Sequence, residues 1–493
     1  MRPFHAVAAP PRIALAPGLE IPRLVTGLWQ VADLERDGRT LDPERGADAL
    51  ADYAAAGFDA FDMADHYGSA EIVAGRLLAR FPGSGRRPAA FTKWCPEPGE
   101  MTPETVRAGV DLARRRLGVE RIDLMQFHWW NYTHPAYLDA MHELARLRGT
   151  GAIAHLGVTN FDADHLHLLL RDGVPVATNQ VCFSLLDRRA AGDMTAVCTE
   201  AGVRLLAYGT LAGGFLSERW LGKPDPGVTG IGDWSKMKYR RFIAAAGGWD
   251  AFQGILAAAD AIARRHGVSI ANVATRWVLD QPAVGAVIVG ARLGESEHRA
   301  DNLGCFAFSL DDADHARLDA AFARTRPIPG DCGDEYRKPP YLTAAGDLSH
   351  HLDAQAQPYA ARRVDGRLRV DTGSVWEPLC GYSRAVKAGS RILVSGTTAT
   401  HGAGRVVCPG DPRGQAVYIL DKIAASLAAL GGGLDDVVRT RIYLRDADHW
   451  EPVGRAHGRA FATARPANTL LEVSRLVGDY LVEIEAEAEL ARD

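Results

Sequence analysis

Short apolar runs alternate with longer amphipathic segments from residue 12 to about residue 310. Such alternation is typical of repeated strand and helix units that build a parallel sheet. In the longer segments apolar residues recur three and four positions apart, as in 43–57, where Gly57 marks the end of a helix. Eight strands are expected, at residues 24–32, 60–66, 89–94, 124–130, 155–160, 177–184, 204–211 and 286–291.

Eight strands with helices between them predict an α/β fold that closes into a (β/α)8 TIM barrel rather than an open sheet. The leading segment RIALAPGLEIPRL has the pattern of a small hairpin, which would close the bottom of the barrel. At 493 residues the chain is longer than one core usually organises, so at least two domains are expected. We assign the barrel to residues 1–326.

A different pattern follows the barrel. Residues 327–372 hold five prolines and little periodic apolar content, which indicates a proline-rich linker with room for a short helix. Residues 373–493 then predict a second, α+β domain that is no repeat of the barrel. Its strands are expected within 382–400, 437–446, 468–476 and 480–490, and its helices within 414–429 and 450–462.

Composition narrows the possible partners. The chain is 47% hydrophobic and 24% charged, with a net charge of −5, so it lacks the basic field that would hold a nucleic acid. It has no uncharged apolar run of about 18 residues and no signal-length apolar stretch near residue 1, so no membrane partner is expected. Seven cysteines without a CxxC pair indicate reduced thiols in the cytoplasm and no predicted metal site.

Four residues at or near the C-terminal ends of three successive strands suit the reduction of a carbonyl group. A barrel keeps its chemistry at these strand ends, and hydride addition to a carbonyl needs an acid close to the oxygen. Tyrosine is a weak acid, but a neighbouring ammonium favours the phenolate, a carboxylate can hold that ammonium, and an imidazole can orient the carbonyl. The sequence offers one residue for each role: Asp62, Tyr67, Lys93 and His128.

These four residues, with the phrases ADHYGSAE, IDLMQFHW, GVTNF and AYGTLAGGFLS, make residues 12–325 similar to the aldo-keto reductase superfamily. The resemblance implies reduction of an aldehyde or ketone with Tyr67 as proton donor. It also implies that NADPH, with NADH as the alternative, lies extended across the barrel mouth without a glycine-rich Rossmann turn.

The resemblance places the two ends of the cofactor. Three residues would hold the nicotinamide carboxamide and one aromatic would stack on the ring: Thr159, Asn160, Gln180 and Tyr208. The phosphate and adenine end follows the eighth strand, where the corresponding positions are Arg292, His298, Asp301 and Asn302. Arg292 offers a cation for a 2′-phosphate, which favours NADPH. For Gln180 and Tyr208, simple packing within a core strand is the competing interpretation.

Tryptophans close to these residues suggest the substrate pocket. Trp29 lies in the first expected strand, Trp94 follows Lys93, and Trp129 with Trp130 follows His128. We expect Trp29, Trp94 and Trp129 to line the pocket, although alternation along a strand must turn at least one tryptophan elsewhere. An aromatic pocket favours a flat or apolar carbonyl substrate.

The second domain resembles the RidA/YjgF reactive-intermediate deaminase family through VSGTT, ILDKIAASLAALGGGLDDVVRTRIYL and LVEIEAEAEL. The resemblance implies trimers that hydrolyse enamines and imines in clefts between subunits, using an arginine for the substrate carboxylate and a glutamate for water. Here Glu483 stands at the glutamate position, Asn468 replaces the arginine, and Tyr382 is a further cleft candidate. Asparagine cannot form a charged bidentate pair with a carboxylate.

Three hypotheses for the second domain therefore remain open. It acts on a substrate without a carboxylate, it binds a small ligand without chemistry, or it serves as the module of a homotrimer. For the whole chain, the alternatives to a reductase with a trimerising domain are a bifunctional reductase and deaminase, or a nicotinamide-binding redox sensor on a trimeric platform. The four residues at the strand ends favour an enzyme.

Overall fold

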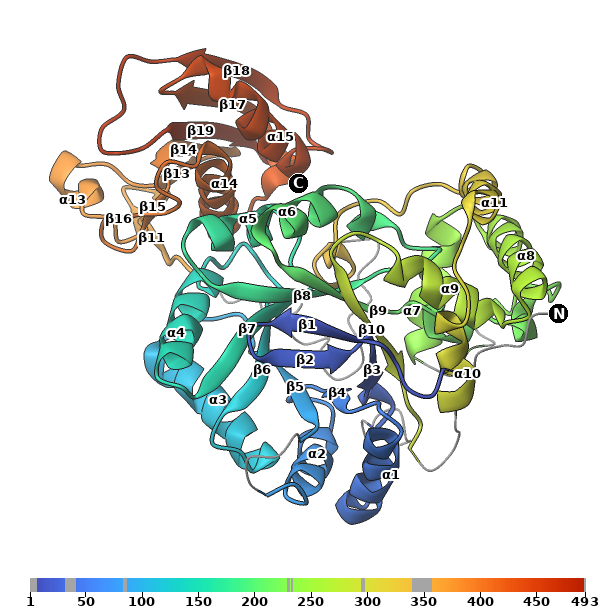
Figure 1. Cartoon of the computed structure of the whole chain (residues 1–493). Coiled ribbons are helices and arrows are strands. Elements are labelled where there is room, and N and C mark those ends of the chain that lie inside the picture. Colours follow the sequence, from blue (N-terminus) through green and yellow to red (C-terminus); the bar gives the residue numbers. More distant parts are fainter. Residues whose placement is uncertain are drawn as a thin grey trace.

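The computed structural model describes residues 7–31, 41–82, 87–227, 231, 234–293, 298–338 and 357–491. Eight parallel strands close into a barrel in sequence order, and the last pairs with the first (Figure 1). This confirms the predicted TIM barrel. The strands are β3 (Leu24–Gly27), β4 (Ala60–Asp62), β5 (Ala89–Trp94), β6 (Ile122–His128), β7 (Ile153–Thr159), β8 (Val176–Cys182), β9 (Arg204–Tyr208) and β10 (Val284–Gly290).

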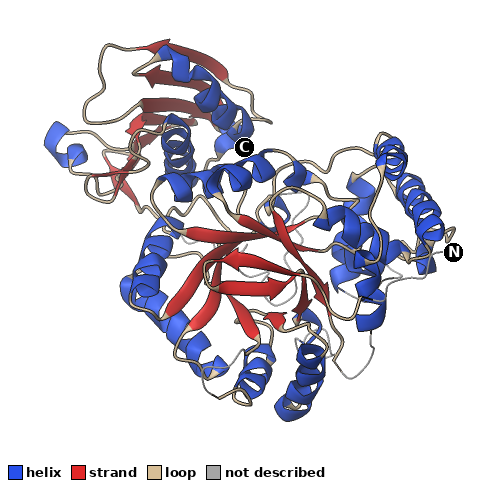
Figure 2. Cartoon of the chain, in the orientation of Figure 1, coloured by secondary structure: helices blue, strands red, loops and turns tan. Residues whose placement is uncertain are grey.

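Helices surround these strands (Figure 2). Local signals set their ends: the Asp42 side chain accepts the backbone N–H groups of Glu44 and Arg45 at the start of α1, and Gly118 ends α3 in a left-handed conformation. The helices are α1 (Pro43–Ala55), α2 (Ala70–Leu78), α3 (Pro103–Leu117), α4 (Tyr137–Gly149), α5 (Ala163–Arg171), α6 (Asp193–Ala201), α7 (Trp234–Ala245), α8 (Trp249–His266), α9 (Ile270–Leu279), α10 (Arg299–Leu303) and α11 (Asp312–Phe322).

The bottom of the barrel is closed by the predicted hairpin, β1 (Arg12–Ala16) and β2 (Leu19–Pro22). Figure 1 shows it across the N-terminal ends of the barrel strands. Leu15 and Ile21 are buried in one cluster with Val25, Phe91 and Leu124 from the barrel interior. The opposite, C-terminal end is therefore the open side for chemistry.

Most barrel strands end earlier than predicted, and β3 and β4 differ the most. β3 ends at Gly27 because Trp29–Val31 forms a 3-10 turn, and β4 ends at Asp62 rather than His66. The residues between Asp62 and α2, including Tyr67, therefore form a loop at the barrel mouth. Short strands leave this loop free to wrap over the strand ends.

The predicted linker, 327–372, is only partly a linker. Residues 328–338, here called the strap, pack on the barrel, with Ile328, Cys332, Asp334 and Glu335 buried. Residues 339–356 lie outside the described part of the chain. β11 (Ala361–Val364) and β12 (Arg367–Val370) already belong to the sheet of the second domain, since β12 pairs with β13. That sheet therefore starts before residue 373.

The second domain has the predicted α+β architecture. Its seven-stranded sheet has the order β11-β12-β13-β14-β19-β17-β18, and only β17 and β18 run parallel among its paired strands. The remaining elements are α13 (Trp376–Cys380), β13 (Ala385–Ala388), β14 (Arg391–Thr398), the small pair β15 (Thr400–His401) and β16 (Arg405–Val406), α14 (Pro412–Ala428), β17 (Val437–Leu444), α15 (Trp450–Ala460), β18 (Ala467–Glu472) and β19 (Val482–Glu489).

Helix α14 joins the two domains, because it packs on its own sheet and on α5 of the barrel. Its residues are buried almost throughout. Charged groups cross the interface: the Asp421 carboxylate accepts a hydrogen bond from Tyr137 at 2.7 Å and lies 3.1 Å from His165 Nε2. Asp164 of α5 binds both Arg413 and Arg459. The interface between the two domains therefore contains specific polar contacts as well as apolar packing.

Two further features concern the whole chain. None of the seven cysteines, all within the described ranges, forms a disulfide. Among the described helices no single one has the length and apolar character needed to cross a bilayer. Only the pair Ser235–Ala245 and Trp249–His266, bent by 101°, meets that standard jointly.

Candidate active site

Lys93 and Asp62 form a buried ion pair inside the barrel mouth. Lys93 Nζ lies 2.6 Å from Asp62 Oδ2, and the two side chains are only 3% and 5% exposed. The ammonium also donates to the carbonyl oxygen of Met63 at 2.9 Å and lies 5.0 Å from the centre of the Tyr67 ring. Because both groups are buried, each charge needs the other to offset the energetic cost of leaving water. The lysine is thereby fixed beside the tyrosine.

Two glutamines complete the surroundings of Asp62. The amide groups of Gln126 and Gln180 donate to Asp62 Oδ1 at 3.0 and 2.7 Å. Gln180, which we assigned to the cofactor, thus also supports the ion pair. Gln126 was missed by the sequence analysis, although its position two residues before His128 on β6 places both side chains on the same face of the strand.

Tyr67 lies in the loop after β4, with its ring 4.9 Å from Trp29 and 4.8 Å from His66. Burial raises the pKa of Tyr67 well above its usual value, and the negative charge of Asp62 raises it further. The predicted lowering by Lys93 is therefore wrong for this structure, because Asp62 offsets the ammonium and the phenol is desolvated. At neutral pH Tyr67 carries its proton and can donate it.

His128 ends β6 and faces the same space. Its Nε2 lies 3.3 Å from Asn160 Nδ2, and its Nδ1 lies 3.6 Å from Cys95 Sγ. Burial lowers the pKa of His128 well below its usual value, and the nearby cationic groups act in the same direction. The imidazole is therefore neutral and can offer one N–H to a carbonyl oxygen.

The four residues predicted for the nicotinamide end lie on neighbouring strand ends, β7, β8 and β9. Asn160 has a φ of +57°, a left-handed conformation that asparagine tolerates. Its Oδ1 accepts from the Tyr208 hydroxyl at 2.8 Å. Thr159 Oγ1 is buried and lacks a hydrogen-bond partner among the described residues. An unpaired buried hydroxyl at this place fits a polar group such as the nicotinamide carboxamide.

Three of the four residues predicted for the adenine end line one pocket. Arg292, His298 and Asn302 lie there with the side chains of Tyr53 and Phe58. The fourth residue, Asp301, is not part of this lining and accepts a hydrogen bond from Ser269 at 3.3 Å. The pocket thus combines a cationic side chain with two aromatic side chains.

Two of the three predicted pocket tryptophans lie elsewhere. Trp94 is 7% exposed and packs against Gly109 of α3, and Trp129 is fully buried on Phe127, with ring centres 5.6 Å apart. Each follows a mouth residue on its strand, so strand alternation turns it outward. Trp29 lies beside Tyr67, and Trp130 lies 5.4 Å from His128.

The strap brings an aromatic side chain to the mouth that the sequence analysis missed. The Tyr336 ring lies 5.1 Å from both His128 and Trp130, and its hydroxyl is 3.0 Å from Lys238 Nζ. The neighbouring Glu335 is fully buried, with one oxygen 3.2 Å from the Tyr208 hydroxyl. The strap contains prolines and lacks apolar periodicity, so no sequence signal indicated that it packs on the barrel mouth.

Arg337 connects the strap to the domain interface. It donates to the carbonyl oxygen of Asn160 at 2.7 Å and lies 4.4 Å from the Tyr132 ring centre. Tyr132 in turn stacks on His165 at 3.4 Å. Burial opposes the His165 charge, but Asp162 and Asp421 outweigh burial and raise the pKa of His165 to about 10. A continuous set of contacts thus runs from the mouth to α14.

The structure brings only some of the residues predicted for the cleft of the second domain close to one another. The Tyr382 hydroxyl accepts from Arg384 at 3.0 Å, and Arg384 acts electrostatically on Glu483, whose pKa burial raises. Asn468 is exposed on β18 and donates to Thr440 at 2.9 Å. Because β17 separates β18 from β19, Asn468 and Glu483 do not share one cleft within a single chain. Arg384, two residues after Tyr382, was missed.

Comparisons with known proteins treat the two domains separately. Residues 23–323 match the aldo/keto reductase family, and residues 373–490 match the family described as endoribonuclease L-PSP. An aldo-keto reductase from Mycobacterium sp. (strain JLS) is 32% identical over 227 residues, which is 45% of this chain and 74% of the relative. An uncharacterized protein from Streptomyces coelicolor is 40% identical over 121 residues, 24% of this chain and 90% of its own.

The solved structure of a glycerol dehydrogenase from Gluconobacter oxydans is 26% identical, with a TM-score of 0.50, and covers 65% of this chain and 98% of that enzyme. The C-terminal region is a RidA/YjgF-type domain. The match to residues 23–323 spans more than half of the 493 residues and includes the four predicted catalytic residues, so the chain belongs to the aldo/keto reductase family.

Proposed function

We propose that the barrel reduces an aldehyde or ketone with a nicotinamide cofactor and that Tyr67 supplies the proton. The observation that carries this proposal is the buried Lys93–Asp62 pair, 2.6 Å apart, beside Tyr67 and opposite a neutral His128. The cluster supplies an acid, a cation that stabilises the phenolate left behind, and a donor for the carbonyl oxygen.

The residues divide the work as follows. Bound NADPH would supply the hydride. His128 orients the carbonyl by a hydrogen bond, so that the oxygen that gains negative charge lies near Tyr67. The phenol transfers its proton to that oxygen, and Lys93 stabilises the resulting phenolate. Asp62, fixed by Gln126 and Gln180, keeps the ammonium in place. A screen of aldehydes, ketones and cyclic imines for NADPH oxidation tests the proposal.

NADPH is the proposed cofactor, with Arg292 as the residue that favours it over NADH. A charge-assisted hydrogen bond to a phosphate contributes about 1.5–3 kcal/mol, which corresponds to roughly 10- to 100-fold in affinity. We expect Arg292→Ala to raise the KM for NADPH by about tenfold or more and to leave the KM for NADH nearly unchanged. Steady-state kinetics with both cofactors measures this, with Arg455→Ala on the second domain as control. Equal losses with both cofactors would contradict the assignment.

For the second domain we propose the role of a trimerisation module. The sheet face opposite α14 carries exposed Leu393 together with a groove lined by Arg439, Arg441, Glu485 and Glu487. A face that carries both signs of charge around an exposed leucine offers the charge pairs and the apolar contact of a subunit interface. The replacement of arginine by Asn468 speaks against deaminase activity on substrates with a carboxylate.

Leu393→Asp is expected to convert a trimer into single chains. The substitution places a charge at the centre of the proposed contact, where desolvation makes it costly. Light scattering coupled to size-exclusion chromatography measures the mass. Ile72→Asp, on α2 of the barrel, is the matched control, because Ile72 is 39% exposed and Leu393 is 45% exposed. A wild-type chain that is monomeric would refute the trimer.

A further inference from the structure

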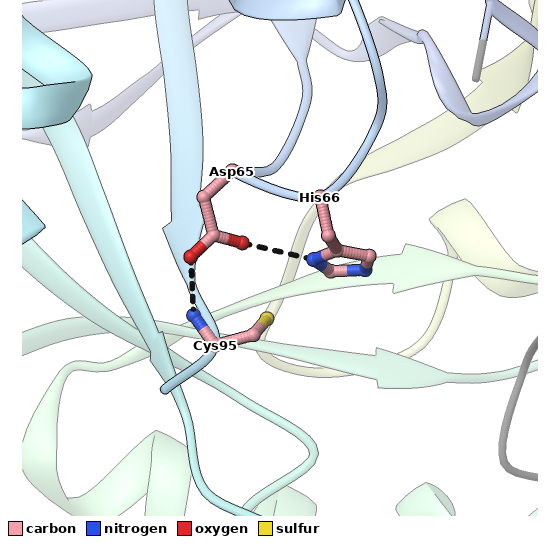
Figure 3. A group of neighbouring side chains, drawn as sticks. All are labelled: Asp65, His66 and Cys95. Carbon is pink, nitrogen blue, oxygen red and sulfur yellow. Dashed lines mark hydrogen bonds and ion pairs between the residues drawn. The ribbon is translucent and has the colours of Figure 1, made fainter. Parts of the chain in front are cut away.

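We infer that Asp65, His66 and Cys95 form a binding site for a thiophilic divalent cation such as Zn²⁺, directly beside His128. Asp65 and His66 lie in the loop after β4, and Cys95 follows β5, so both segments lie at the barrel mouth. Figure 3 shows the three side chains converging, with the Asp65 carboxylate between the imidazole and the Cys95 backbone. The family match says nothing of a metal here.

The distances suit a small ion with nitrogen, sulfur and oxygen ligands. One donor atom from each of the three residues lies within 4.8 Å of the others. His128 Nδ1, the next available nitrogen, is 3.6 Å from Cys95 Sγ. Tetrahedral zinc, with bonds of about 2.3 Å to sulfur and about 2.0–2.1 Å to nitrogen, separates these two ligands by about 3.6 Å. The remaining donors need only a slight contraction around the ion.

The backbone holds these donors in place without an ion. Asp65 donates its N–H to the carbonyl oxygen of Lys93 at 3.0 Å and receives Arg116 on its own carbonyl oxygen at 2.8 Å. Its Oδ2 accepts the Cys95 N–H at 2.9 Å, which ties the two loops together. The Asp65 and His66 side chains are 22% and 16% exposed, so an ion has access from the mouth.

The charges also balance. Binding releases the thiol proton of Cys95 to solvent. The proton between His66 Nδ1 and Asp65, which lie 2.9 Å apart, moves to Nε2 when Nδ1 binds the ion, so the imidazole stays neutral. A thiolate and a carboxylate then neutralise a divalent cation, and neutral imidazole supplies the other nitrogen. Two cations of the neighbouring segments are paired: Lys93 with Asp62 and Arg116 with Glu71. A sulfur and imidazole set selects zinc-like ions over Mg²⁺ or Ca²⁺.

An ion at this site would inhibit carbonyl reduction, and this part of the inference rests on the proposed function. A metal bound by Cys95 Sγ and His128 Nδ1, which already lie 3.6 Å apart, ties up the ring that orients the carbonyl. The site would thus make the reductase sensitive to thiophilic metals.

Co²⁺ binding to the metal-free full-length chain tests the site directly. We expect one equivalent to produce a thiolate-to-cobalt charge-transfer band and the visible bands of tetrahedral cobalt, which Zn²⁺ abolishes. Cys95→Ser should remove the charge-transfer band, and His66→Gln should weaken binding at least tenfold. Cys380→Ser is the matched control, because Cys380 is the exposed cysteine and should leave the spectrum unchanged. Circular dichroism confirms that each variant is folded.

The outcomes separate the site from the proposed function. No charge-transfer band in the wild type, or an unchanged band in folded Cys95→Ser, overturns the metal site. If the band appears, Zn²⁺ should inhibit NADPH oxidation reversibly with a chelator, and each variant is compared with its own metal-free rate. Spectral binding without inhibition overturns the inhibitory role alone. Absence of turnover on any carbonyl counts against the proposed reductase and leaves the cobalt result to decide the site.

Discussion

Tyr67→Phe is expected to lower kcat for carbonyl reduction at least about 100-fold, because a positioned general acid contributes roughly 10²–10⁴ in rate. The substitution removes only the hydroxyl, so the ring contacts with Trp29 and His66 stay. Cofactor binding should persist, since the residues proposed to hold NADPH lie on other strands. Initial rates of NADPH oxidation and a separate fluorescence titration of NADPH measure the two effects.

The control for this substitution is Tyr443→Phe on β17, which removes a hydroxyl from the second domain. It should leave reductase turnover unchanged. A Tyr67→Phe enzyme with a rate near that of the wild type would show that another group donates the proton. Tyr336, whose hydroxyl lies 3.0 Å from Lys238 Nζ, would then be the first residue to replace. Equal loss of NADPH binding and turnover would indicate a structural role for Tyr67.

The fold could be predicted because each barrel unit carries its own local signals. The runs that became β5 to β10 are apolar, the helices between them have caps such as Thr102 and Gly118, and all eight strands were located. The predicted strand ends were less accurate where a strand leads into a loop at the barrel mouth. AFDMADH is apolar beyond Asp62, yet β4 stops there because the following residues turn over the mouth.

The site could be predicted only where strand position fixes it. Lys93 and His128 lie on strands, so their side chains had to face the interior together with Gln126. Strand alternation also explains why Trp94 and Trp129 point away. Contacts between distant segments left no periodic signal: Tyr336 reaches His128 across 208 positions of sequence through a segment rich in proline and charge. Such docking depends on individual contacts.

Gly333→Ala should detach the strap from the barrel mouth. A Cβ at this position would lie 2.0 Å from the carbonyl oxygen of Asn160, and the φ of +82° adds strain for any L side chain. Asn160 cannot retreat, because its N–H is bonded to the Gln180 carbonyl at the end of the barrel strands. The strap must therefore move, and Arg337 loses its bond to Asn160 while Tyr336 leaves His128.

We expect this displacement to reduce kcat/KM for carbonyl reduction about tenfold or more, since misplacement by about 1 Å can cost up to 100-fold. It should also expose the peptide bond after Arg337, whose side chain is 4% exposed, to trypsin, as followed by mass spectrometry. Gly366→Ala is the matched control: its φ is +75°, but nothing lies within 4 Å of the added carbon. It carries the backbone strain without the collision. Equal activity and equal cleavage in the two variants would mean that strap docking is unimportant for the site, whereas selective loss in Gly333→Ala would make the segment between the domains part of the reductase.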